Sequence, residues 1–306
     1  MLGPVLFTLY TQPLVREISK FDLMYHFYAD DTQLYGSCDV NDLDGLITRT
    51  ENCIAAVKTW MNENKLMLND DKTEVLVAGS QRSLKQVDRD SLSIGEEKIE
   101  FSCKSKNLGV YLDDNLSMNA QINHLTSSLY LELRRISKVR DIISFETATL
   151  LVNSLFLSKL DYCNSLLSGV PNDKLKKLQV AQNNAARMIF RKSKREHASP
   201  LLKELHWLPC EKRIMYKLAT MCHKCINDNA PMYLKDLLRL YIPSRTLRSS
   251  TDTTRFVIPK MLMKSYGERS FVHSGPKIWN SLPQNLREIK SFLTFKRHLK
   301  TYLFKC

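Results

Sequence analysis

Two adjacent aspartates, Asp30 and Asp31, stand between short runs of residues that favour β-strands. The strand-favouring side chains on either side of the pair are Tyr25, Phe27, Thr32, Leu34 and Tyr35. This pattern predicts a hairpin over residues 24–35 with both carboxylates at its tip. Two carboxylates this close are costly unless a cation shares them, so the feature favours the metal chemistry of phosphoryl transfer. Adjacent aspartates also occur as Asp70–Asp71 and Asp113–Asp114, and we expect these two pairs in solvated turns.

Length and composition allow a globular protein of more than one domain. The 306 residues are 43% hydrophobic, with nine glycines and ten prolines. No run of 18 apolar residues occurs, so no membrane partner is expected. The eight cysteines follow no regular spacing. Free thiols and an intracellular location are therefore expected, with nucleus and cytoplasm not distinguished.

Charge is divided unevenly along the chain, whose total is +13. Residues 1–113 hold 12 Lys and Arg against 18 Asp and Glu, which gives −6. Residues 114–306 hold 33 Lys and Arg against 14 Asp and Glu, which gives +19. An acidic part with paired aspartates and a strongly basic part suit metal chemistry beside a polyanion, so the split favours a nucleic-acid partner.

Apolar periodicity predicts an α+β fold in which strands precede residue 114 and helices dominate after it. In the first part we expect a helix within 3–20, the hairpin 24–35, a helix over 41–64, a strand around 66–77, a hairpin over 92–101 and a strand over 108–112. In the second part, apolar stripes predict helices that include 175–188 and 211–226. The clearest domain boundary is near residue 114, and a softer one lies near 195.

Residues 2–113 carry four short motifs in a fixed order. They are Leu2-Gly3-Pro4-Val5-Leu6-Phe7, Tyr28-Ala29-Asp30-Asp31, Leu68-Asn69 with Lys72-Thr73-Glu74, and Lys106-Asn107-Leu108-Gly109-Val110-Tyr111-Leu112-Asp113. Together they resemble the second half of the palm of a reverse transcriptase from a non-LTR (LINE-type, jockey-like) retrotransposon. The implied fold of residues 1–113 is a partial palm, an antiparallel sheet with packed helices.

The resemblance implies a role for each matched residue. Asp30 would be a principal Mg2+ ligand and Asp31 a supporting one, and Lys72 would approach the incoming nucleotide triphosphate. The residues that resemble the primer grip are Asn107, Leu108, Gly109 and Val110. The implied partners are an RNA template, a DNA primer and, as small-molecule substrate, a deoxynucleoside triphosphate.

The basic part also resembles the region that follows the polymerase in the same elements. The matching motifs are His206-Trp207-Leu208-Pro209, Ala230-Pro231-Met232-Tyr233-Leu234, Pro243-Ser244-Arg245, Leu247-Arg248-Ser249 and Trp279-Asn280-Ser281-Leu282-Pro283. Residues 114–195 would be a helical thumb-like region and residues 196–306 a basic helical C-terminal region. Candidate phosphate contacts are Arg134, Arg135, Lys138, Arg140, Arg187, Arg191, Lys192, Lys194 and Arg195. The alternative for each of them is an ordinary solvated basic surface.

Cys222 and Cys225 raise a zinc alternative, because His206 and Cys210 upstream would complete four ligands. Residues 211–226 also have the periodicity of one amphipathic helix, in which the cysteines would serve as small buried side chains. The sequence leaves both interpretations open and favours the helix.

By the same resemblance, the chain is expected to be a C-terminal fragment that starts inside the palm. A third metal-binding carboxylate and the fingers would lie upstream of Gly3. We therefore expect a reverse-transcriptase-domain protein of a retrotransposon, whose parent synthesises DNA from RNA and which is inactive alone. The alternative is a non-catalytic nucleic-acid-binding or interaction module derived from the element. An unrelated metal-dependent nuclease would leave the string over residues 106–113 unexplained.

Overall fold

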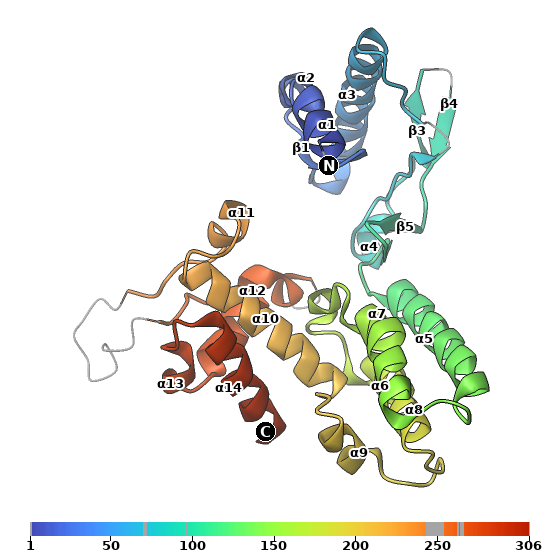
Figure 1. The fold of residues 1–306 in the computed structure, drawn as a ribbon. Coiled ribbons are helices and arrows are strands. Elements are labelled where there is room, and N and C mark those ends of the chain that lie inside the picture. The colour runs from blue at the N-terminus through green and yellow to red at the C-terminus, as the bar shows by residue number, and fades with distance from the viewer. Residues whose placement is uncertain are drawn as a thin grey trace. The chain divides into compact units, whose positions relative to one another are not determined.

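The computed structural model describes residues 2–69, 72–95, 97–242, 254–261, 263 and 266–305. The chain divides into two compact units, Met1–Ser117 and Met118–Cys306. Small antiparallel sheets occur in the first unit, and the second is mostly helical (Figure 1). The predicted α+β class is confirmed. The division into regions 1–113, 114–195 and 196–306 stays a prediction.

The first unit combines helices with three two-stranded antiparallel sheets among its described residues. Its helices are α1 (Gly3–Thr11), α2 (Leu14–Ile18), α3 (Leu43–Glu63) and α4 (Gln81–Leu84). Its strands are β1 (Met24–Tyr28), β2 (Asp31–Tyr35), β3 (Ser91–Ile94), β4 (Glu97–Glu100), β5 (Lys104–Asn107) and β6 (Val110–Asp113). The pairs are β1 with β2, β3 with β4, and β5 with β6. The predicted hairpins over 24–35 and 92–101 are confirmed, as is the long helix within 41–64.

Two strand predictions need correction. Among the described residues of 66–77, Val75 alone takes part in β pairing, as a single bridge to Phe101. The apolar residues there belong to a connecting segment whose Leu68 and Val75 side chains pack against the core formed by α3 and β3. The strand expected over 108–112 starts at Val110, because Leu108 and Gly109 form the turn between β5 and β6. Strand β5 has no apolar pattern in the sequence, because all four of its residues are polar. Ser105 and Asn107 are half-buried, and the other two are exposed.

Helix α3 organises the core of the first unit by burying two faces. Cys53 and Val57 pack with residues of α2 and the segment before β1, namely Leu14, Ile18 and Leu23. Ile47 and Ile54 pack against Leu92 and Ile94 of β3. Full burial of each aliphatic side chain contributes about 1.5–3 kcal/mol, so α3 holds the unit's small sheets to its helices.

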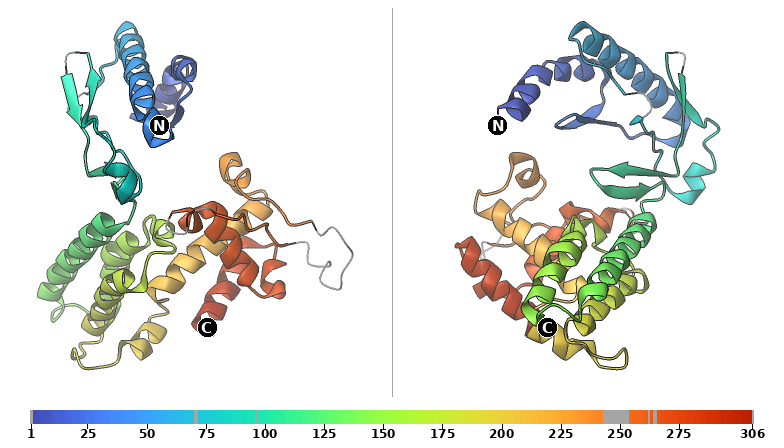
Figure 2. Two further views of the ribbon diagram at one scale, coloured as in Figure 1. Left: turned by 180° about the vertical axis from the view of Figure 1, so that it is seen from behind. Right: turned by 45° about the vertical axis from the view of Figure 1, so that its right-hand side comes forward.

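The second unit consists of helices α5 (Asn119–Val139), α6 (Phe145–Val152), α7 (Ser158–Asp161), α8 (Asn172–Ile189), α9 (Ala198–Glu204), α10 (Cys210–Ile226), α11 (Met232–Lys235), α12 (Phe271–Ser281), α13 (Gln284–Arg287) and α14 (Phe292–Lys305). Helix α10 is the central element, because it contacts α8 as well as α12 and α14 (Figure 2). A π-helical turn, Asn153–Leu157, connects α6 to α7. In the described part of the chain, no helix has the length and apolarity needed to cross a membrane.

The predicted apolar stripes of the second unit form its core. On α8, Leu175, Leu178, Ala181 and Ala185 are buried and Met188 is half-buried. On α10, Ile214, Leu218 and Cys222 are buried and Met221 is half-buried. Around the C-terminal end of α10, Trp279 and Phe295 are fully buried, and the Trp279 indole Nε1 donates to the Thr254 carbonyl at 2.6 Å. The motifs at 243–245 and 247–249 lie outside the described residues.

Candidate functional site

The β1–β2 hairpin carries the two aspartates at its tip. Tyr28 and Asp31 are the last pair of the ladder, so Ala29 and Asp30 form the turn. Ala29 has φ of 54°, in the left-handed region, which costs about 1–2 kcal/mol for a residue with a Cβ. Both aspartates are exposed. The turn that presents the two carboxylates to solvent therefore contains a strained backbone conformation at Ala29.

The β5–β6 hairpin carries the residues that resemble the primer grip. Asn107 and Val110 are its last pair, with Leu108 and Gly109 between them. Their φ values are 44° and 81°, and positive φ at both central residues is what a type I′ hairpin turn requires. Val110 is buried, whereas Gly109 is exposed. The four predicted residues thus lie together at the tip of one hairpin.

Two hydrogen bonds connect the separate motifs of the first unit. The Gln33 side chain on β2 donates from Nε2 to Asn107 Oδ1 at 2.6 Å. The backbone N–H of Lys106 donates to Glu74 Oε2 at 3.0 Å. The aspartate hairpin, the primer-grip-like hairpin and the segment that carries Lys72 are therefore linked. Gln33 went unnoticed in the sequence because its partner lies 74 residues away.

Lys72 lies in a short turn two residues before Glu74, and its side chain is exposed. Its backbone N–H donates to the Asn69 carbonyl at 3.2 Å. Asp70 and Asp71, for which we expected a solvated turn, lie outside the described residues.

The aspartate pair is chemically suited to Mg2+ but is a small donor set. Mg2+ prefers hard oxygen ligands and is held by one or two carboxylates together with waters and substrate phosphates. Among the residues that the structure describes, no group of three or more His, Cys, Asp or Glu is placed to hold a metal ion. Asp30 and Asp31 thus fit a site that a nucleotide would help to complete.

Asp113 corrects the expectation of a solvated turn at the third aspartate pair. It ends β6 and is only 9% exposed. Its carboxylate accepts hydrogen bonds from the backbone N–H of Ser117 and, at 2.9 Å, from the Ser117 hydroxyl. Asp113 therefore fixes the loop that follows the hairpin.

Most predicted phosphate contacts are at the surface of the helical unit. The exposed ones are Arg134, Arg135, Lys138, Arg191, Lys192, Lys194 and Arg195. Arg135 lies 3.2 Å from Glu132, and Lys192 lies 3.9 Å from Glu196. Arg187 is half-buried, and its Nε donates to the Glu196 carbonyl at 2.9 Å. Arg191 Nη2 donates to the carbonyls of Arg140 and Asp141, at 3.0 and 3.2 Å. The exposed residues most available to a polyanion are therefore Arg134, Lys138, Lys194 and Arg195.

Arg140 differs from the rest because it is only 7% exposed. Its guanidinium donates to the carbonyls of Met188 and Ile143, both at 3.1 Å, and to that of Ile189. Met188 and Ile189 end α8, so the guanidinium supplies donors to carbonyls at a helix C-terminus, where the Met188 carbonyl also accepts from the backbone N–H of Arg191 at 3.2 Å. Arg140 is an internal cap and is unavailable as a phosphate contact.

The zinc alternative gains no support from the geometry. Cys210, Cys222 and Cys225 are free and buried within or beside α10. Burial raises the pKa of the Cys210 thiol to about 12, which disfavours the thiolate that zinc requires. The His223 Nε2 lies 2.7 Å from the Ile289 carbonyl, and burial lowers the pKa of its imidazole. His206 is exposed, and no metal cluster appears in the described residues.

Residues 1–112 match the family model of reverse transcriptase (RNA-dependent DNA polymerase). This segment is a reverse transcriptase domain. The match ends within the first compact unit and includes both linked hairpins. The matched segment is similar to RNA-directed DNA polymerases, a family that generally uses Mg2+ and binds a nucleic-acid template and primer. The comparison with curated proteins finds no match.

Proposed function

We propose that the reverse transcriptase domain is the palm portion of an RNA-directed DNA polymerase from a non-LTR (LINE-type, jockey-like) retrotransposon. The observation that carries this proposal is the hydrogen bond from Gln33 to Asn107, at 2.6 Å. It joins the aspartate hairpin to the hairpin that resembles the primer grip, and polymerisation needs a primer end held beside the metal site. The motifs over 2–113 give the proposal its retrotransposon type.

In this proposal, Asp30 and Asp31 hold Mg2+, which when bound supplies positive charge to the reacting phosphates. The carboxylates bind and orient the ion from a turn fixed by the Tyr28–Asp31 pair. Lys72 approaches the triphosphate and neutralises or protonates the leaving pyrophosphate. Asn107, Leu108, Gly109 and Val110 position the primer end, and Gln33 holds their hairpin in register with the aspartates.

The helical unit would hold the nucleic acid by its backbone. Exposed Arg134, Arg135 and Lys138 on α5 and the basic run Arg191–Arg195 supply phosphate contacts. Such contacts give affinity without sequence selection and weaken as salt rises. We assign residues 114–195 as the thumb-like region and 196–306 as the basic C-terminal region.

We further propose that this chain, tested alone, binds template and primer without extending the primer. Two carboxylates are a minimal donor set for two metal ions, and no larger ligand cluster is found among the described residues. The competing function is a non-catalytic nucleic-acid-binding or interaction module. It also predicts nucleic-acid binding, but it gives Asp30 and Asp31 no metal-binding role.

The test measures metal binding and extension separately. Mn2+, a paramagnetic substitute for Mg2+, is titrated into 15N-labelled protein with a template–primer duplex and a deoxynucleoside triphosphate. We expect line broadening confined to amides near Ala29–Thr32, lost in the Asp30→Ala/Asp31→Ala variant and kept in Asp88→Ala, a control at an exposed aspartate. Broadening that is unchanged by the double variant would overturn the metal assignment and favour the non-catalytic module.

Primer extension on an RNA template with Mg2+ is run on the same proteins. Binding without extension is the expected result for this chain. Extension that the double variant abolishes would support the roles of Asp30 and Asp31 and would overturn the proposal that the chain alone is inactive.

A further inference from the structure

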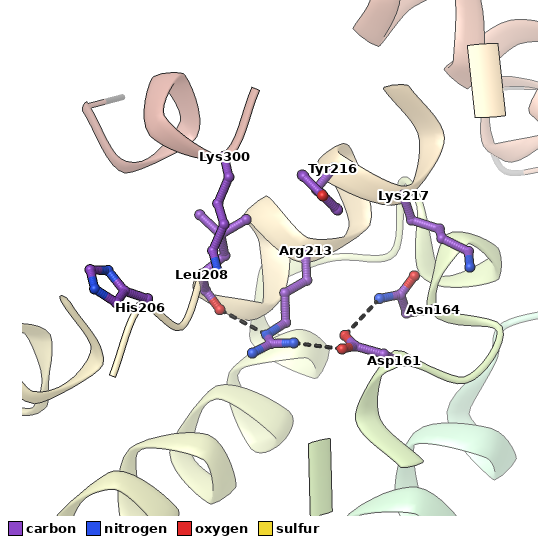
Figure 3. Close-up of a pocket in the computed structure, with 8 residues that line it drawn as sticks. All are labelled: Asp161, Asn164, His206, Leu208, Arg213, Tyr216, Lys217 and Lys300. Carbon is purple, nitrogen blue, oxygen red and sulfur yellow. Dashed lines mark hydrogen bonds and ion pairs between the residues drawn. The ribbon is translucent and has the colours of Figure 1, made fainter. Parts of the chain in front are cut away.

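A cavity of about 290 Å3 lies within the helical unit (Figure 3), and none of its lining residues belongs to the segment that matches the polymerase family. Its lining includes the polar residues Asp161, Asn164, His206, Arg213, Lys217 and Lys300, together with Tyr216. Arg213 and Lys217 are on α10, one helical turn apart, and Lys300 is on α14. Because positions four apart share a helix face, α10 directs two cations toward the same space.

Positive charge exceeds negative charge in this lining. Arg213 is the anchored cation: its Nη1 lies 2.7 Å from Asp161 Oδ2, and its Nε donates to the Leu208 carbonyl at 2.9 Å. Among the described residues, no ion pair joins Lys217 or Lys300 to a carboxylate. Burial, and then the Arg213 charge, lower the pKa of the Lys300 ammonium. The three cations Arg213, Lys217 and Lys300 thus outnumber the single carboxylate of Asp161, so the lining favours a bound anion.

Asn164 adds a second and independent requirement. The residue is only 5% exposed, and its Nδ2 donates to Asp161 Oδ1 at 3.2 Å. Its Oδ1 is buried and accepts no hydrogen bond from any described residue. A buried amide oxygen without a donor is costly, so a ligand that offers an O–H beside its anionic oxygens would satisfy it.

We propose that this cavity binds an RNA phosphate together with the adjacent ribose 2′-hydroxyl. The phosphate oxygens would accept from Lys217, Lys300 and the free edge of the Arg213 guanidinium, and the hydroxyl would donate to Asn164 Oδ1. The 2′-hydroxyl is the group by which a protein distinguishes RNA from DNA. The helical unit would then prefer RNA at one defined point, in addition to the unselective grip of its surface lysines and arginines.

The minimal ligand is adenosine 3′-monophosphate, in which the phosphate and the 2′-hydroxyl are vicinal. Its affinity for the full chain is compared by calorimetry with that of 2′-deoxyadenosine 3′-monophosphate and of inorganic phosphate. The loss of one hydrogen bond predicts roughly threefold to tenfold weaker binding of the deoxy compound. Equal affinity of the two nucleotides would overturn the proposal, as would equal affinity of inorganic phosphate.

Variants locate the binding in the cavity. Lys217→Gln and Lys300→Gln are each expected to weaken adenosine 3′-monophosphate by about tenfold, since each removes a charged hydrogen bond. Lys277→Gln, at an exposed lysine of α12, is the matched control and should bind as the wild type does. A thermal melt shows whether each variant is folded. Loss of affinity in the control as large as in the cavity variants would overturn the assignment to this cavity.

A final experiment distinguishes a free nucleotide from an RNA chain as the ligand, and tests an acidic peptide as the competing partner. A short RNA ending in a 3′-phosphate that competes with the mononucleotide supports a site for RNA chains, whereas exclusion of the RNA would overturn that part. Displacement of the nucleotide by a polyglutamate peptide with higher affinity would identify an acidic peptide as the partner and overturn the RNA proposal. None of these measurements depends on polymerisation, so the outcome is independent of the proposed function.

Discussion

Replacement of Arg140 by alanine is expected to destabilise the helical unit strongly. The change removes a buried guanidinium that donates to the carbonyls of Ile143, Met188 and Ile189. A hydrogen bond from a charged donor contributes about 1.5–3 kcal/mol, but contributions that share one side chain do not add fully. We expect a loss of about 4 kcal/mol, because three hydrogen bonds from a charged donor are lost and their buried carbonyl acceptors lose that donor. For a unit of this size, about 2–4 °C per kcal/mol gives a fall in Tm of roughly 10 °C.

The assay is thermal unfolding followed by circular dichroism at 222 nm, with hydrogen exchange at the end of α8 as a local readout. Arg134→Ala is the matched control on the same helix, where the exposed side chain should shift stability by less than about 0.5 kcal/mol. Arg140→Lys should fall between the two, because an ammonium cannot reproduce the planar fork. If Arg140→Ala melted as the control does and bound nucleic acid more weakly, the capping role would be refuted.

Three further predictions concern glycine geometry, an ion pair of a buried glutamate with a partly exposed lysine, and a buried thiol. Gly169 has φ of 69°, and a Cβ there would lie 2.7 Å from Cγ of Arg269, so Gly169→Ala should lower Tm. Gly45 lies within α3 with open space around its Cα, so Gly45→Ala should raise the free energy of unfolding by about 0.5–1 kcal/mol. The hydrogen bond from Lys159 holds the pKa of the Glu132 carboxyl below its usual value. The stability that it adds is therefore complete above the unfolded-state pKa and is lost as pH falls through the folded-state pKa. Urea unfolding of wild type and Glu132→Gln should differ at pH 7 and converge in acid; a constant difference would contradict this origin. Burial raises the pKa of the Cys222 thiol far above its ordinary value, so iodoacetamide should label it only on unfolding, as mass spectrometry would show, and rapid labelling of the native protein would contradict its burial.

The elements predictable from the sequence are those whose signal is local. The hairpin around Asp30 and Asp31 is set by neighbouring strand-favouring residues, and α3, α8 and α10 are set by apolar residues at helical spacing. In the helices the side chains that define the pattern are mostly buried, whereas in the hairpin they are at most half-buried and Tyr35 is exposed. The roles assigned to Asp30, Asp31, Lys72 and the 107–110 tip come from motif order and stay predictions.

The features that the sequence concealed depend on partners far along the chain. Gln33 and Glu74 are ordinary polar residues until the fold brings them to β5. Arg140 has the same chemistry as its exposed neighbour Arg135, and only the position of the end of α8 makes it a cap. Strand β5 was missed because a two-stranded ribbon at the surface buries too little to require apolar alternation.

The left-handed backbone at Ala29 bears on how a mutational scan of the aspartate turn should be interpreted. Positions 29 and 30 are adjacent, yet substitutions that weaken metal binding at these two positions would do so for different reasons. At position 29, with φ of 54°, a β-branched residue such as valine would fail through backbone strain, while glycine would be accepted. At position 30 a substitution would remove a carboxylate and leave the turn intact. Raised metal concentration would partly rescue only the second class, so the scan itself would separate residues that shape the turn from residues that use it.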